Sequence, residues 1–318
     1  MSDFAVYQTE AVREHLDYPG CIEAVRRAMA ELSRSGVDQP LRNITTIRPD
    51  RLFALMPGVA TDAPGFGAKL ISVFHDPVKG GRSAHLGVVV LFEEATGEVV
   101  CVADAHEVTK VRTACNSAVA TSVLAREDAS TLAIFGCGTQ AEAHVRAIPL
   151  VRSIERILIC GREEKTARQF ADQASRLTDA EVMVVNDGRE AAGAADIICT
   201  VTGASEPILF RDWVKPGTHI NAVGSSHPRP VEIDPELVAA SDYFVESRKS
   251  ALAAAAEFLR AKSLGLVDDS HIRAEIGEVI NGDAGGRSGD SQVTLYKSLG
   301  HIVQDLAAAR YLHQSASG

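Results

Sequence analysis

The sequence predicts an α/β protein that combines a doubly wound parallel sheet with a separate N-terminal α/β domain. Two patterns carry this prediction: residues 44–104 read as short strands between turns, whereas residues 131–247 alternate apolar strands with helices. Length agrees, because a chain of 318 residues is long for one core and domains hold about 150 residues each.

The N-terminal part is predicted to combine helices with an antiparallel sheet. Apolar residues recur at helical spacing from Tyr18 onward, and Gly36 is a natural helix end. Gly, Pro and Asp turns separate about five strand-like stretches between residues 44 and 104. Residues 105–126 are predicted to be helical, and so is the segment 292–312, which we expect to return to this domain.

Strands and helices alternate strictly in the second part. Continuous apolar strands separated by helices are typical of a parallel sheet covered on both faces. We therefore expect residues 114–292 to form this domain, and residues 1–113 with 293–318 to form the other. The six predicted strands are 131–136, 156–161, 181–185, 196–201, 219–224 and 242–247.

Composition argues against several classes of partner. The formal net charge is -10, and nucleic-acid binding relies on Lys and Arg that neutralise phosphates, so no nucleic acid is expected. No apolar stretch approaches the roughly 20 residues that span a bilayer, and the N-terminus lacks a signal-peptide pattern, so no membrane partner is expected. The six cysteines form no CxxC pair and no zinc-like spacing, which predicts no metal site and a cytoplasmic location.

A glycine-rich turn follows the first strand of the alternating part. It reads GCGTQA from Gly136 to Ala141, which is a GxGxxA pattern and a weak signal by itself. Context strengthens it, because the turn follows an apolar strand, opens a helix and begins a βαβ unit. Gly136 permits the tight turn, Gly138 lets the backbone approach a pyrophosphate, and the first helical N–H groups face the anion. We therefore predict that Gly136, Gly138, Thr139 and Gln140 bind a dinucleotide in a Rossmann domain; a glycine turn without nucleotide is the alternative.

The end of the second strand indicates which dinucleotide binds. An Asp or Glu there binds the ribose 2′-hydroxyl of NAD, whereas an Arg accommodates the 2′-phosphate of NADP. Arg162 occupies this place, and no acidic residue precedes it. NADPH is therefore the predicted cofactor, with NADH as the second choice; the alternative is that Arg162 is an ordinary surface residue.

Four further motifs occur along the chain. They are FGAK at 66–69, VRTACNSA at 111–118, HINAVG at 219–224 and TLYKSLG at 294–300. These motifs resemble the ornithine cyclodeaminase/mu-crystallin family, and they follow the family's order along nearly the whole chain. The resemblance implies a two-domain homodimer. Its N-terminal domain, joined by the C-terminal helix, dimerises and holds substrate, while the Rossmann domain holds the cofactor. Members include ornithine cyclodeaminase, an alanine dehydrogenase, mu-crystallin and reductases of cyclic imino acids.

The same resemblance assigns roles to individual residues. Arg42, Lys69 and Arg112 match the family residues that bind the substrate carboxylate, and a guanidinium can fix a carboxylate with two parallel hydrogen bonds. The alternative for each of them is an ordinary ion pair. Asp305 matches a family residue too, and we interpret it as a capping or helix-contact residue. The cofactor-binding positions that the resemblance implies are His85, Arg112, Thr113, Thr202 and Val223. For His85 the alternative is an ordinary histidine at the edge of a strand.

Two departures from the cyclodeaminase pattern favour a reductase. Ala54 stands where cyclodeaminases have a carboxylate before a Leu-Met-Pro turn, and Ser226 stands where they have a catalytic Asp. Cyclodeamination needs a positioned base, whereas hydride addition to an imine needs mainly positioning and a hydride donor. Mu-crystallin, a ketimine reductase, also has Ser at this place. Lys69 and Ser226 are the candidate catalytic residues, with Ser226 near the imine nitrogen.

These residues predict an NAD(P)H-dependent enzyme that reduces the C=N bond of a small cyclic imino acid. The expected reaction converts Δ1-pyrroline-2-carboxylate to L-proline, with Δ1-piperideine-2-carboxylate to L-pipecolate as a second reaction. Three alternatives stay open: reductive amination of a 2-oxo acid as in alanine dehydrogenase, cyclodeamination of ornithine, and NADPH-dependent ligand binding without catalysis.

Overall fold

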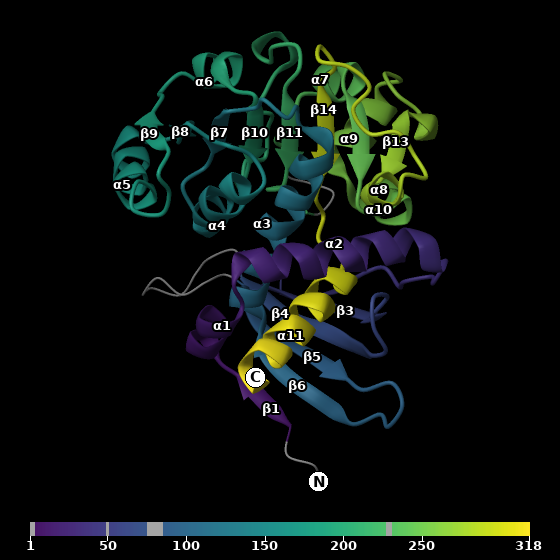
Figure 1. Cartoon of the computed structure of the whole chain (residues 1–318). Helices are drawn as coiled ribbons and strands as arrows, with labels where there is room; N and C mark the ends of the chain where they lie inside the picture. Colours follow the sequence, from purple (N-terminus) through teal and green to yellow (C-terminus); the bar gives the residue numbers. More distant parts are fainter. Residues whose placement is uncertain (1–3, 49–50, 75–84, 227–230) are drawn as a thin grey trace. The chain divides into compact units, whose positions relative to one another are not determined.

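A computed structural model of the chain describes residues 4–48, 51–74, 85–226 and 231–318, except for the side chains of Phe74 and His85 (Figure 1). The chain divides into two compact units, one of Met1–Arg112 with His301–Gly318 and one of Thr113–Gly300. The boundary falls within helix α3 (Ala105–Leu124). Each unit has its own sheet.

The first unit contains a six-stranded sheet in the order β1-β6-β5-β4-β3-β2. Strands β2 to β6 pair antiparallel, as predicted, and the short β1 joins β6 in parallel. The strands are β1 (Ala5–Tyr7), β2 (Asn43–Arg48), β3 (Arg51–Val59), β4 (Phe66–Phe74), β5 (His85–Phe92) and β6 (Val99–Asp104).

Helices cover one face of this sheet. Helix α11 (Ile302–Ser317) packs against β3, β4 and β5 and also against α2 (Tyr18–Ser35), as Figure 1 shows. Helix α2 begins at the cap Asp17, whose side chain accepts a hydrogen bond from Gly20 N, and ends at Gly36 with a φ of 63°. A short helix, α1 (Thr9–His15), lies beside β1.

The opposite face of the sheet, here called the outer face, carries exposed apolar side chains. Strand alternation places every second residue of β3, β4 and β5 on this face. Two of its rings, Phe66 and Phe92, stack with centroids 5.0 Å apart. The exposed apolar residues of the outer face are Phe53, Val59, Phe66, Leu86 and Val88.

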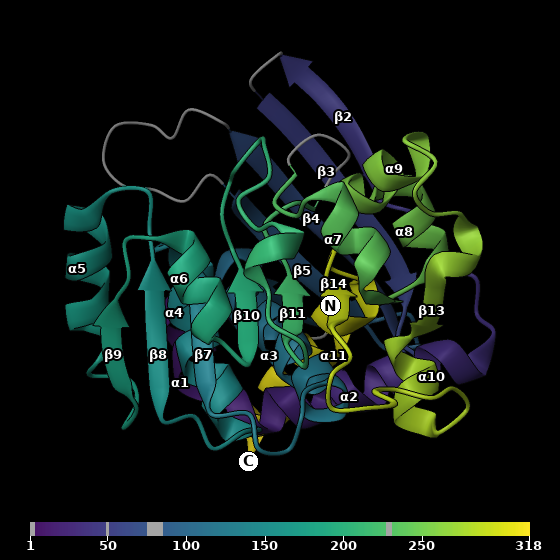
Figure 2. The ribbon, with the colours of Figure 1, turned by 90° about the horizontal axis from the view of Figure 1, so that it is seen from above.

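The second unit contains an eight-stranded sheet whose neighbouring strands all pair in parallel, in the order β13-β12-β14-β11-β10-β7-β8-β9. Figure 2 shows β9, β8, β7, β10 and β11 side by side. All six predicted strands form, which confirms the doubly wound fold. They are β7 (Thr131–Phe135), β8 (Arg156–Cys160), β9 (Glu181–Val184), β10 (Ile197–Thr200), β11 (His219–Ala222) and β12 (Asp242–Val245).

The segment predicted to be helical over 292–312 differs in its first part. Strand β14 (Thr294–Lys297) lies between β11 and β12, and the helix starts only at Ile302. Threonine, leucine and tyrosine suit a buried strand, and this tertiary environment overrides the helical periodicity. The strand therefore places residues 294–300 in the second unit, whereas we expected them in the first. A further strand, β13 (Ile272–Glu275), extends the sheet beyond β12.

The connections of this sheet define where a ligand can bind. From β7 the chain continues to β8 and β9 on one side and later to β10 and β11 on the other. Ligands of doubly wound sheets bind beyond the carboxyl ends of the strands at such a switch point. The helices of this unit are α4 (Thr139–Ala147), α5 (Glu164–Ala174), α6 (Gly188–Ala194), α7 (Pro235–Ala240), α8 (Arg248–Ala254), α9 (Ala256–Ser263) and α10 (Ile276–Asn281), besides the end of α3.

Candidate active site

A buried cationic group lies in the first unit, between its sheet and α11. Lys69 on β4 and Arg112 on α3 both direct their charges at Asp305, in the first turn of α11. Asp305 Oδ1 accepts hydrogen bonds from Lys69 Nζ at 3.1 Å and from Arg112 Nε at 3.0 Å. A second nitrogen of the guanidinium, Nη1, donates to Gln304 Oε1 at 2.7 Å. The three charged side chains are at most 4% exposed.

Asp305 confirms one half of our interpretation of this residue. We took it for a capping or helix-contact residue; His301 and Gln304 form the cap of α11, but Asp305 does contact a second helix through Arg112 of α3. Asp305 forms ion pairs with both cations, and within the described part of the chain its Oδ2 has no hydrogen-bond partner. Its place on a helix face that is otherwise mostly apolar was the one available signal, because a buried carboxylate requires partners.

Lys69 has an unusual electrostatic environment. The pKa of Lys69 is lowered to about 8, chiefly by burial and also by the positive charges of Arg112 and Arg42, while Asp305 opposes the shift. Arg42, the third predicted anion-binding residue, is half-buried and lies near enough to act on this ammonium. One carboxylate thus faces a surplus of positive charge, which suits an anionic ligand.

Ala54 lies beside Lys69, where the cyclodeaminase pattern has a carboxylate. Ala54 pairs with Ile71 and Met56 pairs with Lys69, so positions 54 and 69 are diagonal neighbours on one face of the sheet. Ala54 is buried and offers only a methyl group. No proton acceptor therefore comes from this position.

The glycine turn of the second unit has the shape of a nucleotide cradle. Gly136 adopts a φ of 124°, and a Cβ added there would lie 2.9 Å from Val201 O, so glycine is required. A Cβ at Gly138 would meet nothing within 4 Å, so the space beside it is open. Gly138 caps α4 without a side-chain hydrogen bond, which leaves the first N–H groups of the helix, those of Thr139 and Gln140, directed at this space. These residues fit a dinucleotide.

Arg162 lies at the same edge of the sheet. It follows β8, whose last residue, Cys160, pairs with Phe135 at the end of β7. The Arg162 side chain is exposed. Helix α5 begins nearby at Glu164, without a side-chain cap. The arrangement agrees with the place expected for an adenosine ribose.

The residues predicted on the other side of β7 follow β10 and β11. Val223 is buried, and Ser226 is half-buried. Thr202 is held firmly, because its backbone N and its Oγ1 each donate to Glu232 Oε1 at 2.7 Å. Glu232 was not foreseen, since it lies 30 residues further along the chain in an irregular segment.

Two other positions that we predicted to bind the cofactor are His85 and Thr113. The side chain of His85 lies outside the described residues, so only its place at the start of β5 is known. Thr113 is buried and is the first residue of the second unit.

Several residues of the resemblance motifs have structural partners rather than open surroundings. Asn116 Nδ2 donates to Glu246 Oε1 at 2.7 Å and to the hydroxyl of Tyr296 at 2.8 Å. Glu246 Oε2 also accepts from Leu299 N at 2.9 Å. The motifs at 111–118 and 294–300 therefore meet in one buried cluster of the second unit.

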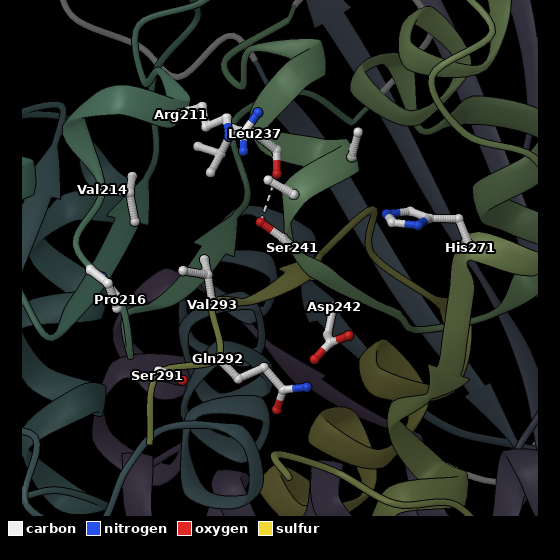
Figure 3. A pocket seen from close by; sticks show the side chains of 12 residues that line it. Arg211, Val214, Pro216, Leu237, Ser241, Asp242, His271, Ser291, Gln292 and Val293 are labelled. Atoms are coloured by element: carbon white, nitrogen blue, oxygen red, sulfur yellow. Dashed lines mark hydrogen bonds between the residues drawn. The ribbon is translucent and has the colours of Figure 1, made fainter. Parts of the chain in front are cut away.

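A pocket of about 420 Å³ lies at the opposite edge of the second sheet (Figure 3). Asp242 at the start of β12 and Val293 just before β14 line it, together with Arg211 and His271. No residue that we predicted to bind substrate or cofactor lines this pocket, so it is separate from the candidate site.

Together these features define an α/β protein whose parallel sheet fits a dinucleotide and whose first unit buries two cationic side chains around Asp305. The model of the ornithine cyclodeaminase/mu-crystallin family matches residues 3–318, and the chain belongs to this family. Within the described residues, no helix is long and apolar enough to cross a membrane.

Named relatives agree with the family. The chain is 36% identical over 283 residues to a Δ1-pyrroline-2-carboxylate reductase of Bacillus cereus, covering 86% of this chain and 87% of that one. It is 34% identical over 318 residues to the ketimine reductase mu-crystallin of Mus musculus, covering 98% and 97%. A solved structure, the Δ1-pyrroline-2-carboxylate reductase of Thermococcus litoralis with NADH and L-proline, superposes with a TM-score of 0.95 at 30% identity, covering 99% and 98%.

Proposed function

We propose that this protein reduces the C=N bond of Δ1-pyrroline-2-carboxylate with NAD(P)H and releases L-proline. The observation that carries the proposal is the buried cationic group around Lys69 in a chain that also has a dinucleotide-binding sheet. The relatives support it: one is named as a Δ1-pyrroline-2-carboxylate reductase and another as a ketimine reductase, and the Thermococcus litoralis enzyme binds NADH and L-proline. Δ1-Piperideine-2-carboxylate is the second proposed substrate.

In this proposal, Arg42, Lys69 and Arg112 bind the carboxylate next to the imine carbon. The surplus positive charge around Asp305 supports this role, because an anionic ligand would balance it. A fixed carboxylate also fixes the neighbouring carbon, which lowers the entropic cost of reaching the reactive geometry. Reduced nicotinamide, when bound, supplies the hydride that this carbon accepts.

The proton needed at the imine nitrogen is assigned to the protein's own residues. Because its pKa is about 8, the Lys69 ammonium still holds its proton at neutral pH but can release it more readily than an exposed lysine. Ser226 is proposed to bind the imine nitrogen through its hydroxyl. No base is needed at Ala54, which favours imine reduction over cyclodeamination.

NADPH is the proposed cofactor, with NADH as a second one. Arg162 supports the preference, since an exposed guanidinium after the second strand can pair with a 2′-phosphate. The NADH in the Thermococcus litoralis structure shows that relatives accept the unphosphorylated form.

We further propose that two copies pair through the outer face of the first sheet. Phe53, Phe66, Leu86 and Val88 give this face exposed apolar area, and such surfaces mark interaction sites. We also propose a cytoplasmic location, which is supported by the six cysteines being free thiols.

A substrate panel tests the activity. Purified protein is mixed with each cyclic imine, with pyruvate plus ammonia, or with ornithine, and nicotinamide absorbance is followed with NADPH and NADH in parallel. We expect oxidation of NADPH with Δ1-pyrroline-2-carboxylate and formation of L-proline. Turnover with pyruvate plus ammonia alone would contradict imine reduction and indicate reductive amination. Release of ammonia from ornithine would indicate cyclodeamination instead. Cofactor binding without any turnover would indicate a ligand-binding protein.

A further inference from the structure

A buried charged group lies behind the segment that precedes Ser226. Lys297, the last residue of β14, forms an ion pair with Glu257 of α9, with Nζ 3.2 Å from Oε2. Both side chains meet at the hydroxyl of Ser225: Lys297 Nζ donates to its Oγ at 2.6 Å, and this Oγ donates to Glu257 Oε1. Lys297 and Glu257 are each at most 1% exposed, and Ser225 is fully buried.

A second buried carboxylate extends this group to the neighbouring strand. Glu232 Oε2 accepts from Thr200 Oγ1 at 2.9 Å and from Gly224 N at 2.7 Å, and its Oε1 binds Thr202. The backbone N of Glu232 donates to Glu257 Oε1 at 3.3 Å. One continuous polar group therefore ties together the segments that follow β10 and β11 and the end of β14.

The packing around this group leaves little freedom. A Cβ added at Gly224 would lie 2.1 Å from Thr202 O and 2.5 Å from Glu232 Oε1, so the two segments touch through backbone. Burial raises the pKa of Glu232, but the hydrogen bonds from Thr202 favour its ionised form. Glu257 and Lys297 offset each other's charge, which makes the pair tolerable in a dry interior.

A gain in folding stability does not explain why the protein buries these charged side chains. A buried ion pair costs desolvation that its attraction barely returns, and apolar side chains of the same volume stabilise a fold as well or better. A buried polar group does fix geometry, because each member accepts only a few directions. The position of this polar group in the sheet therefore indicates which segment it holds in place.

That place is the carboxyl edge of the sheet, on one side of the switch point. The glycine turn and Arg162 follow β7 and β8, which suits the adenosine half of a dinucleotide. Thr202 and the segment 223–226 follow β10 and β11, on the side where the nicotinamide half of a bound dinucleotide extends. Ser225 is anchored inward, so its neighbour Ser226 is the residue whose position the anchor sets.

We propose that Lys297 and Glu257 are positioning residues that act through Ser225 to hold segment 223–226 against the nicotinamide end of the cofactor. This inference rests on the proposed function, since it assigns the segment to the reacting half of the dinucleotide. The ion pair supports the rate of hydride transfer and leaves the affinity for the cofactor, which the glycine turn and Arg162 provide, largely unchanged.

The test compares Glu257→Gln, Lys297→Met and the double variant with wild type. For each single variant we expect kcat with the cyclic imine to fall roughly 100-fold, because small misplacements carry costs of this size, while Kd for NADPH stays within about threefold. The double variant removes both members of the ion pair and should regain part of the thermal stability, since neither member keeps a buried charge without its partner. Glu232 stays in place and loses the attraction of Lys297. The kcat of the double variant should stay low. A kcat that recovers together with Tm in the double variant would overturn the proposal, as would unchanged kcat in the single variants.

Lys215→Met is the matched control. Lys215 pairs with Asp196 at 2.9 Å at the amino edge of the same sheet, away from the segment 223–226. This variant should lose stability without a large change in kcat. An equal loss of kcat in Lys215→Met would show that the effect follows general destabilisation and would overturn the proposal.

The fluorescence of bound NADPH separates this inference from the proposed function. Its emission reports the surroundings of the reduced nicotinamide and needs no turnover. Absence of imine reduction by wild type would contradict the proposed function only. Emission in Glu257→Gln and Lys297→Met identical to wild type, at equal saturation, would overturn the positioning role whether or not the enzyme turns over.

Discussion

At the scale of single residues, Asp305 sets the charge state of Lys69. Burial and two arginines favour the neutral amine, whereas Asp305 acts to keep the ammonium charged. Carboxylate binding needs the charged form. The wild-type enzyme should therefore lose kcat/KM as the pH rises through the pKa of Lys69, about 8.

Asp305→Asn should move the alkaline limb of the pH profile, which is the fall of kcat/KM with rising pH, to lower pH. Loss of the carboxylate removes the interactions that raise the pKa of Lys69, so the amine becomes neutral nearer pH 7. We expect kcat/KM at pH 8 to fall roughly 10- to 100-fold, as for loss of a charge-assisted contact. Steady-state rates between pH 6 and pH 9 measure this. Glu107→Gln, which removes a buried carboxylate paired with Arg13 in the same unit, should leave the limb in place. An unshifted limb in Asp305→Asn would show that another group titrates.

Arg162 determines cofactor preference at the same scale. Arg162→Ser removes the cation proposed to pair with the 2′-phosphate, so kcat/KM with NADPH should fall roughly 10- to 100-fold. The value with NADH should change only a few-fold, because NADH has no such phosphate. Arg168→Ser is the control, since Arg168 is exposed on α5 and pairs with Glu164. Equal losses with both cofactors would contradict the assignment.

At the scale of elements, periodicity predicted most of the fold, and its failures have physical causes. The six strands from β7 to β12 are continuous apolar runs, so the sequence could reveal them. Strand β14 was not predicted because its four residues precede a long helical pattern. Strand β13 was not predicted because Arg273 and Glu275 interrupt its apolar character. Both are stabilised by neighbours that are distant in sequence.

The candidate site likewise has a part that the sequence could predict and a part that it could not. The glycine turn is local and its motif revealed it, whereas the partners of Lys69 could not be read from spacing, because Asp305 lies 236 residues away. Lys297 and Glu257 were missed for the same reason. Tertiary folding brings these charges together, and a single sequence does not indicate which charged residues will form pairs.

Helix α4 also provides a prediction about acid stability. His144 is fully buried, with Nε2 2.9 Å from Ser117 Oγ and Nδ1 2.7 Å from Gln140 O. Burial lowers the pKa of His144 to about 4, from 6.5 in an unfolded chain. Between these values the unfolded state binds more protons, so stability is lost as the pH falls from 6.5 toward 4. His144→Gln should reduce this slope in urea unfolding at pH 5 and pH 7. His313→Gln, near the C-terminus, is the control and should keep the wild-type slope.

At the scale of the whole molecule, the proposed pairing of two copies through the outer face can be tested at Phe66. Phe66 lies on this face and stacks on Phe92, and it is 38% exposed in a single chain. A symmetric pair would present each substitution twice in one interface, so a single charge there acts doubly. Phe66→Asp should therefore convert a dimer to monomers, because it places unpaired carboxylates in an apolar contact.

Sedimentation equilibrium or light scattering measures the mass, and circular dichroism checks that the variant is folded. Leu264→Asp is the control, since Leu264 is 61% exposed in the second unit and should leave the dimer intact. A monomeric wild type would contradict pairing altogether, and a folded Phe66→Asp variant that stays dimeric would place the interface on another surface. If Phe66→Asp is monomeric and still reduces the imine at the wild-type rate, each chain holds a complete site. A parallel loss of activity would mean that pairing shapes the cationic group, which lies on the other side of the same sheet.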